Sequence, residues 1–400
     1  MNTQPMSLPD GAKYILERYL SVGHDAYIVG GAVRNHLLGL PIYDYDITTS
    51  ATPEETKELF SLDRIVDTGI RHGTVTLVLD DGQYEITTFR TDGEYLDNRH
   101  PSSICFSRSL DDDLSRRDFT VNAMCYNDAV GFVDRFSGMA DIRAGLIRAV
   151  GEPAVRFSED ALRILRALRF ASTLGFRIEK ETAAAILEKK ELLSSVSRER
   201  IFTEWRKTLE GSGAYDILKD YKGVISVIIP ELDGLELPQR DRFSSAEWYI
   251  RQLGLFLASS EDPVSSFGAA MRSLRADNFR IRQGASALSC LLSERLDNTV
   301  GIKTAIYHFG VDAVRDAISL GILTDRLSEE NMKALDSVID SGEPTSLSGL
   351  EIDGRELISL GFVGEEVGRA LDCLMLAVIR GECPNEREAL VEYILGEAFR

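Results

Sequence analysis

Two aspartates separated by one tyrosine, Asp44 and Asp46, are the residues of this chain best suited to metal chemistry. In an extended segment, residues two positions apart point to the same side, so a strand would present both carboxylates on one face. Mg2+ uses such a rigid carboxylate pair when it also takes oxygens from a nucleotide. We therefore predict a Mg2+ site at Asp44 and Asp46, which would lie on a second strand.

A pair of glycines precedes these aspartates. Tyr27 to Val29 form an apolar run typical of a buried strand, Gly30 and Gly31 permit a turn, and residues 32–38 are typical of a helix start. Backbone amides at such a turn, beside the positive end of a helix, favour an anion such as a triphosphate. Arg34 adds a full positive charge, so the sequence predicts a phosphate site beside the metal site.

Each of these features also has a plain structural interpretation, because a Gly-Gly turn is often only a turn and an Asp-x-Asp pair is often solvated. A dinucleotide-binding turn requires G-x-G-x-x-G, whereas residues 29–33 read VGGAV. The dipeptide His24-Asp25 does not indicate a phosphohydrolase, because the five histidines of the chain form no matching series of ligands. The joint spacing nevertheless favours a phosphate site beside a metal site.

The order of strand, Gly-Gly, Arg and Asp-x-Asp resembles that of the class II tRNA nucleotidyltransferase and poly(A) polymerase family. Further motifs follow in the family's order: a strand with Glu85, a ribose-recognising motif at 116–123, a hinge-like element with Asp134 and Gly138, a nucleobase-reading motif at 159–163, and a buttressing helix element at 197–200. The resemblance covers residues 26 to about 210. A weaker one reaches the end through 352–354, Gly361, Gly364, Gly368 and Asn385.

The resemblance assigns roles to individual residues. It implies that Asp44 and Asp46 bind the metal and that Glu85 is a third catalytic carboxylate, which either binds metal or helps to activate the attacking 3′ hydroxyl. The nucleotide-binding residues that it implies are Gly31, Arg34, Arg117, Asp160, Arg163, Arg166 and Arg169. For Arg166 and Arg169 we expect triphosphate contacts, and the alternative is a salt bridge on the helix surface.

The segment from Ser158 predicts a helix with Ile164, Leu165 and Leu168 on its packed side and the charged residues on the rest. A carboxylate can accept from the exocyclic amine of cytosine or adenine, and a guanidinium can donate to the ring acceptors, so Asp160 with Arg163 would match both bases. Guanine and uracil would leave these groups unpaired, at a cost of about 1–3 kcal/mol each.

One position departs from the family, which usually has Asp after the first-motif Arg, whereas this chain has Asn35. Asn still accepts a hydrogen bond but carries no charge, so a structural tie would be weakened while the metal pair stays intact.

The resemblance implies a CCA-adding enzyme that extends the 3′ end of tRNA from CTP and ATP. Alternatives within the family are a CC-adding or A-adding enzyme and a poly(A) polymerase, and a more distant one is a non-catalytic RNA-binding relative. The polar connector at 91–112 resembles the flexible loop of full CCA-adding members, which favours the first interpretation. The intact pair of Asp44 and Asp46 argues against a non-catalytic protein.

The hydrophobic pattern changes once, after 151–153, from short alternating strands to helical spacing. We expect an α+β head with a mixed sheet and helices, followed by an all-α remainder. The expected parts are a catalytic head at 1–150, a nucleobase-reading neck at 151–215, an RNA-binding body at 216–342 and a tRNA-binding tail at 343–400. Breaks are expected at 234–238 and 342–349.

Composition sets the outer limits. The net charge of −19 argues against a nucleic-acid binder, but residues 156–207 carry twelve Lys or Arg against eight Asp or Glu, a local basic excess. Five cysteines without C-x-x-C spacing predict reduced thiols. No membrane span or secretory signal is indicated, so we expect a cytoplasmic protein. The sequence leaves the oligomeric state open, with a homodimer among the alternatives.

Overall fold

A computed structural model describes residues 1–93 and 104–396, and the chain divides into two compact units, Met1–Ile228 and Ile229–Arg400. The first unit contains a seven-stranded mixed sheet in the order β3-β4-β5-β2-β1-β8-β9. Its strands are β1 Ala26–Val29, β2 Ile47–Thr49, β3 Arg64–Gly69, β4 Thr74–Leu79, β5 Gly82–Thr88, β8 Met124–Asn127 and β9 Gly131–Asp134. β2 and β5 are parallel and the other neighbours antiparallel, which confirms the expected mixed sheet.

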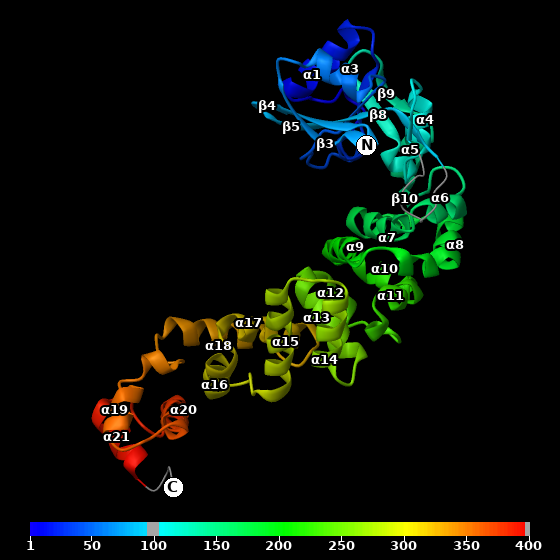
Figure 1. Ribbon diagram of the computed structural model, residues 1–400. Helices are drawn as coiled ribbons and strands as arrows, with labels where there is room; N and C mark the ends of the chain where they lie inside the picture. The colour runs from blue at the N-terminus through cyan, green and yellow to red at the C-terminus, as the bar shows by residue number, and fades with distance from the viewer. Residues whose placement is uncertain (94–103, 397–400) are drawn as a thin grey trace. The chain divides into compact units, whose positions relative to one another are not determined.

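Short helices surround this sheet, and α1 and α3 lie together on one of its faces (Figure 1). The buried Tyr19 hydroxyl of α1 donates to Thr56 of α3 at 2.8 Å. α3 begins with a capping box between Thr52 and Glu55, so its sequence specifies its own start. The helices of this part are α1 Asp10–Ser21, α2 Gly31–Leu38, α3 Pro53–Leu59, α4 Leu110–Ser115 and α5 Gly138–Ala144.

The rest of the first unit is helical, as expected. Its helices are α6 Pro153–Glu159, α7 Leu162–Leu174, α8 Lys180–Lys189, α9 Arg198–Glu210, α10 Ala214–Asp220 and α11 Lys222–Ile228. A two-residue strand, β11 Arg177–Ile178, pairs in parallel with β10 Leu146–Ile147 and joins this part to the preceding one. α7 packs on α9, and it buries Ile164, Leu165 and Leu168 as predicted.

The described residues of the second unit form helices without strands. These helices are α12 Arg240–Ser245, α13 Trp248–Ser259, α14 Pro263–Ser273, α15 Asn278–Ser293, α16 Thr299–Phe309, α17 Val311–Leu323, α18 Glu329–Asp340, α19 Gly354–Ser359, α20 Glu365–Arg380 and α21 Arg387–Leu395. One apolar core lies among α15 to α18, and another lies among α19 to α21. No helix in the described part of the chain is long and apolar enough to cross a membrane.

Candidate active site

The turn between β1 and α2 has the predicted strand, glycine pair and helix. Gly30 has φ 72° and ψ −124°, a conformation that side chains rarely adopt, and α2 begins at the next residue. Two guanidinium groups lie beside the turn. A Cβ on Gly30 would lie 3.5 Å from Arg117, and one on Gly31 would lie 3.6 Å from Arg34. The glycines therefore leave room for a ligand between backbone amides and two arginines.

Asp44 and Asp46 flank the same turn, but not on a strand as predicted, because β2 begins only at Ile47. The antiparallel register pairs Ile28 with Ile47, and the Val29 amide donates to the Asp46 carbonyl at 2.9 Å. If the strand pairing continued in this register, Asp44 would face Gly31. Gly31 already belongs to α2, so the pairing stops before it. The end of β1 therefore leaves both aspartates exposed, in a segment without regular secondary structure before β2.

Glu85 lies next to Asp46 because β5 runs parallel to β2. The register pairs Ile47 with Ile86, so the residue before each, Asp46 and Glu85, are neighbours across the strands. Partial burial, and then the charge of Glu85, raise the pKa of the Asp46 carboxyl. Asp44 also contributes to this shift, while Arg117 opposes it. We call Asp44, Asp46 and Glu85 the acidic edge.

The acidic edge suits a cation by its chemistry. No side-chain hydrogen bond or ion pair joins these three carboxylates to another residue in the described ranges, and burial together with the repulsion among them raises the pKa of Asp46. Within those ranges, no group of three or more His, Cys, Asp or Glu is close enough to enclose an ion. The donor set therefore fits a divalent ion held by the two aspartates, with its other ligands from a nucleotide or water.

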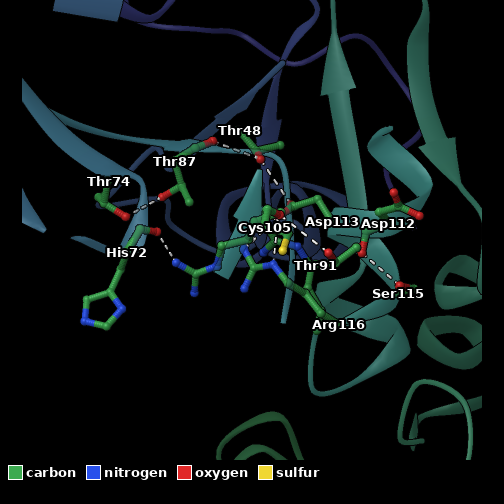
Figure 2. A network of polar contacts seen from close by, with 12 residues as sticks. Thr48, His72, Thr74, Thr87, Thr91, Cys105, Asp112, Asp113, Ser115 and Arg116 are labelled. Carbon is green, nitrogen blue, oxygen red and sulfur yellow. Dashed lines mark hydrogen bonds and ion pairs between the residues drawn. The ribbon is translucent and has the colours of Figure 1, made fainter. Parts of the chain in front are cut away.

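Asp113 was not among the predicted site residues, yet it holds both arginines of the ribose motif. Its fully buried carboxylate accepts from Arg116 at 2.7 Å, from Arg117 at 3.0 Å and from the Thr48 hydroxyl at 3.1 Å, part of the network in Figure 2. Burial acts to raise the pKa of Asp113, but Arg117 and Arg116 outweigh it and lower that pKa. The spacing of three and four residues, from α4 to the two positions just after it, was the available sequence signal.

Arg117 is thereby aimed at the glycine turn. Its Nε is buried without a hydrogen-bond partner among the described residues. A buried donor without an acceptor costs free energy, so this guanidinium is suited to a ligand that supplies the acceptor.

Three further arginines surround the ring of Phe170 on α7. The guanidinium carbons of Arg34, Arg166 and Arg169 lie 5.0, 5.4 and 3.8 Å from the ring centroid. We call this group the arginine cluster. It brings together three predicted nucleotide-binding residues from two helices, around a phenylalanine that was not among the predicted site residues.

Each α7 arginine of the cluster also has a carboxylate partner. Arg166 Nε donates to Asp118 at 2.8 Å, and Arg169 Nε lies 2.6 Å from a Glu204 oxygen. Burial acts to raise the pKa of Asp118, but Arg166 and the Asn122 amide lower it to about 2. The salt bridges that were the alternative for Arg166 and Arg169 are therefore present, and they lie within the cluster.

The predicted single helix from Ser158 is wrong, since two helices meet at the nucleobase-reading motif. Asp160 is extended, with φ −136° and ψ 101°, and its carboxylate accepts from the Leu162 amide at 3.1 Å, where α7 begins. This carboxylate also accepts from Arg200 at 3.1 Å, which places the predicted buttress against Asp160.

Arg163 does not lie on an open charged face as expected. Its side chain is buried, donating to Glu159 at 2.8 Å and to the Arg116 carbonyl at 3.0 Å. These two bonds orient Arg163 from both its own motif and the ribose motif.

The hinge-like element is a capped helix. Asp134 accepts from the amides of Gly138 and Met139, at 2.8 and 2.9 Å, and so caps α5. A Cβ on Gly138 would lie 2.3 Å from the Thr120 carbonyl oxygen, so only glycine fits. The predicted connector at 91–112 lies partly outside the described residues, because 94–103 are not described. Its described ends pair as β6 Arg90–Asp92 and β7 Ile104–Phe106.

Three family models match the chain. Residues 26–148 match the poly A polymerase head domain, residues 175–235 match the "Probable RNA and SrmB-binding site of polymerase A", and residues 252–394 match tRNA nucleotidyltransferase domain 2.

Full-length relatives agree with these models. A CCA-adding enzyme of Streptococcus gordonii is 38% identical, and one of Limosilactobacillus fermentum is 37% identical, each over 95% of both chains. The crystal structure of the Bacillus stearothermophilus CCA-adding enzyme in complex with CTP is similar with a TM-score of 0.79, at 30% identity over 96% of both chains. A Thermotoga maritima CCA-adding enzyme complexed with tRNA shares the fold, with a TM-score of 0.68 at 22% identity.

Proposed function

We propose that this chain, which belongs to the CCA-adding enzymes of the class II tRNA nucleotidyltransferase and poly(A) polymerase family, adds C, C and A to the 3′ end of tRNA from CTP and ATP. One observation carries the proposal. The glycine turn at Gly30 lies beside the guanidinium of Arg117 and is joined through Val29 to Asp46 of the acidic edge. A triphosphate and a metal ion would therefore be adjacent.

In the proposed reaction, the tRNA 3′ oxygen bonds to the α-phosphorus of the nucleotide, the bond from that phosphorus to the bridging oxygen breaks, and pyrophosphate leaves. Asp44 and Asp46 would hold Mg2+, which supplies neutralisation of charge on the phosphoryl oxygens. Glu85 is exposed beside them and would receive the hydroxyl proton or help to hold the ion. Gly31, Arg34, Arg117, Arg166 and Arg169 would bind the triphosphate and ribose.

Nucleobase choice is assigned to Asp160 and Arg163. The contacts of Asp160 with Arg200, and of Arg163 with Glu159 and Arg116, give each group a set direction before a base binds. Such preorganisation favours bases that present an amine and an acceptor at adjacent positions, as cytosine and adenine do.

The proposal also assigns the parts of the chain. Residues 1–150 would form the catalytic head and 151–215 the nucleobase-reading neck, while a body at 216–342 and a tail at 343–400 would bind tRNA. The basic excess within 156–207 supports a phosphate-binding role for the neck. A tRNA substrate implies work in the cytoplasm.

Product length tests the proposal. The protein is incubated with tRNA lacking its CCA end, with CTP alone, with ATP alone and with both. We expect two added nucleotides with CTP, and completion to three only with both. A product that stops at CC, a product that gains only A, or a long adenosine tail would each contradict the proposal in favour of a specific relative.

A further inference from the structure

Asn35 occupies a position between the arginine cluster and the acidic edge. Its side-chain oxygen accepts from Arg34 Nε at 3.2 Å and from Arg34 Nη2 at 2.9 Å, and its side-chain nitrogen donates to the Pro41 carbonyl at 2.9 Å. A guanidinium only donates and a carbonyl only accepts, so the two partners fix the orientation of the amide. A carboxylate could serve Arg34 but would repel the Pro41 oxygen.

The first consequence concerns the charge of Arg34. No carboxylate lies within ion-pair distance of this guanidinium in the part of the chain that the structure describes, in contrast to Arg166 with Asp118 and Arg169 with Glu204. Burial and the nearby charge of Arg169 lower the pKa of Arg34 to about 10, with Asp118 opposing. The neutral Asn35 orients Arg34 without cancelling its charge, which leaves that charge for an anion.

The second consequence concerns the segment that carries the two aspartates. It is held at one end by the bond from Asn35 to Pro41, together with the bond from the Leu40 amide to the Asn35 carbonyl at 2.9 Å. At the other end, the Val29 amide holds the Asp46 carbonyl. Asp44 lies between these anchors. Loss of the Pro41 bond would therefore free the part of the segment from Pro41 to Asp44 to move.

A continuous series of polar contacts ends at this amide. Arg166 donates to Asp118, which accepts from Asn122 at 3.1 Å, and Asn122 accepts from Arg34 at 2.5 Å. Arg34 then donates to Asn35. α7, the ribose motif and the Pro41–Asp46 segment are thereby connected, and Asn35 is the link to Pro41, three positions before Asp44.

We propose that Asn35 is a positioning residue with two tasks: it keeps the full charge of Arg34 available to the nucleotide triphosphate, and it fixes the segment that carries Asp44 and Asp46. The proposal rests on the proposed function, since it takes the anion to be the triphosphate of CTP or ATP.

Two variants separate the tasks. Asn35→Asp keeps an acceptor for Arg34 but adds a negative charge, so CTP binding measured in EDTA should weaken about fivefold, equal to ~1 kcal/mol. Asn35→Ala adds no charge, so CTP binding in EDTA should change by less than about twofold, while the Mg2+ concentration for half-maximal turnover should rise about fivefold. If Asn35 had only a structural role, the isosteric Asn35→Asp would bind CTP better than Asn35→Ala. The proposal predicts the opposite order of CTP affinity.

The control is Asn298→Asp, at the exposed start of α16, where Asp can keep the bond that Asn298 accepts from the Gly301 amide at 2.9 Å. It adds the same charge outside the nucleotide site and should leave CTP binding in EDTA unchanged. In Asn35→Asp, the KM for CTP and ATP should rise together, because the triphosphate is common to both.

Wild-type affinity for CTP in the Asn35→Asp variant would overturn the first task, and an unchanged Mg2+ requirement in Asn35→Ala would overturn the second. Losses that follow only the melting temperatures of the variants would overturn both. Failure of the proposed function appears instead in the wild-type protein, as absence of nucleotide addition to tRNA lacking CCA.

Discussion

The acidic edge and the arginine cluster adjoin the same turn but are built on opposite principles. Asp44, Asp46 and Glu85 are exposed and have no cationic partner at hydrogen-bond distance in the described ranges, whereas Arg166 and Arg169 are partly buried and paired with carboxylates. An exposed carboxylate can take up and release an ion quickly. Paired guanidiniums keep one geometry in the absence of ligand, at the cost of some of their charge.

This difference indicates how the site divides its work. The arginine cluster is preorganised, because Phe170 and two carboxylates hold its geometry before a nucleotide binds. The acidic edge gains its order from the ion and the substrate. Substitutions on the acidic edge should therefore affect the chemical step, and substitutions in the arginine cluster should affect binding and discrimination.

The largest effect is expected from Asp44→Ala or Asp46→Ala. Each variant removes half of the inferred metal-binding pair, so nucleotide addition should fall by about a thousandfold or more. tRNA binding should stay nearly unchanged, because the basic neck and not the acidic edge is expected to hold the RNA. The control is Asp80→Ala, an exposed aspartate at the β4–β5 turn. Turnover near the wild-type rate in either variant would refute the metal assignment.

Asp113 holds Arg117 beside the glycine turn that both regions adjoin, and its removal should have the largest effect on stability. Asp113→Asn leaves two partly buried guanidiniums without their counter-charge, so the free energy of unfolding should fall by about 3–5 kcal/mol. The folded-state pKa of Asp113 is lowered, so its stabilisation is complete above the ordinary pKa of 3.8 and is lost as the pH falls below that value. The difference in melting temperature between wild type and variant should accordingly shrink on acidification from pH 7 to pH 3.

Much of this site followed from the sequence, and the exceptions have one cause. The strand, the glycine turn, α2 and the burial of Ile164, Leu165 and Leu168 depend on local pattern, and all were predicted. The start of β2 depends on where β1 ends, and the break at Asp160 depends on Arg200, forty positions away. Phe170 draws its importance from arginines on two helices that the fold brings together, and Asp113 adds Thr48, sixty-five positions away, to its local arginine pairs. Local spacing does not specify such pairs.

In the neck, Arg163→Ala should reduce the discrimination between CTP and UTP. It removes the donors expected at the base edge, so the ratio of kcat/KM for CTP to that for UTP should fall about tenfold, and correct addition should slow. Arg143→Ala, on the exposed side of α5, is the control. If rates fall while the ratio of CTP to UTP use stays constant, Arg163 contacts phosphate or serves the structure.

Phe170→Leu should separate the cluster's geometry from its charge. All three arginines remain, but they lose the ring that they share, worth about 0.5–1 kcal/mol per exposed contact. We expect the KM for CTP and ATP to rise together by about fivefold, with a smaller change in kcat. Phe157→Leu, at a buried phenylalanine on α6, controls for lost packing. Equal effects of both substitutions on KM would contradict a specific role for the Phe170 ring.

The smallest expected effect tests whether the acidic edge stores repulsion. Burial and then the charge of Glu85 raise the pKa of Asp46, and a carboxyl whose pKa is raised on folding destabilises the folded state as the pH rises through that pKa. Glu85→Gln should therefore raise the melting temperature at pH 7 by about 1 °C, because the exposed site is screened by solvent. The gain should shrink as the pH falls through the pKa of Asp46, because a protonated Asp46 no longer repels a charge at position 85, and nucleotide addition should fall at every pH. A variant that is more stable but less active would indicate that the carboxylates repel one another in the folded protein and are needed together for metal binding. A melting temperature that falls at pH 7 would show that Glu85 supports the fold instead.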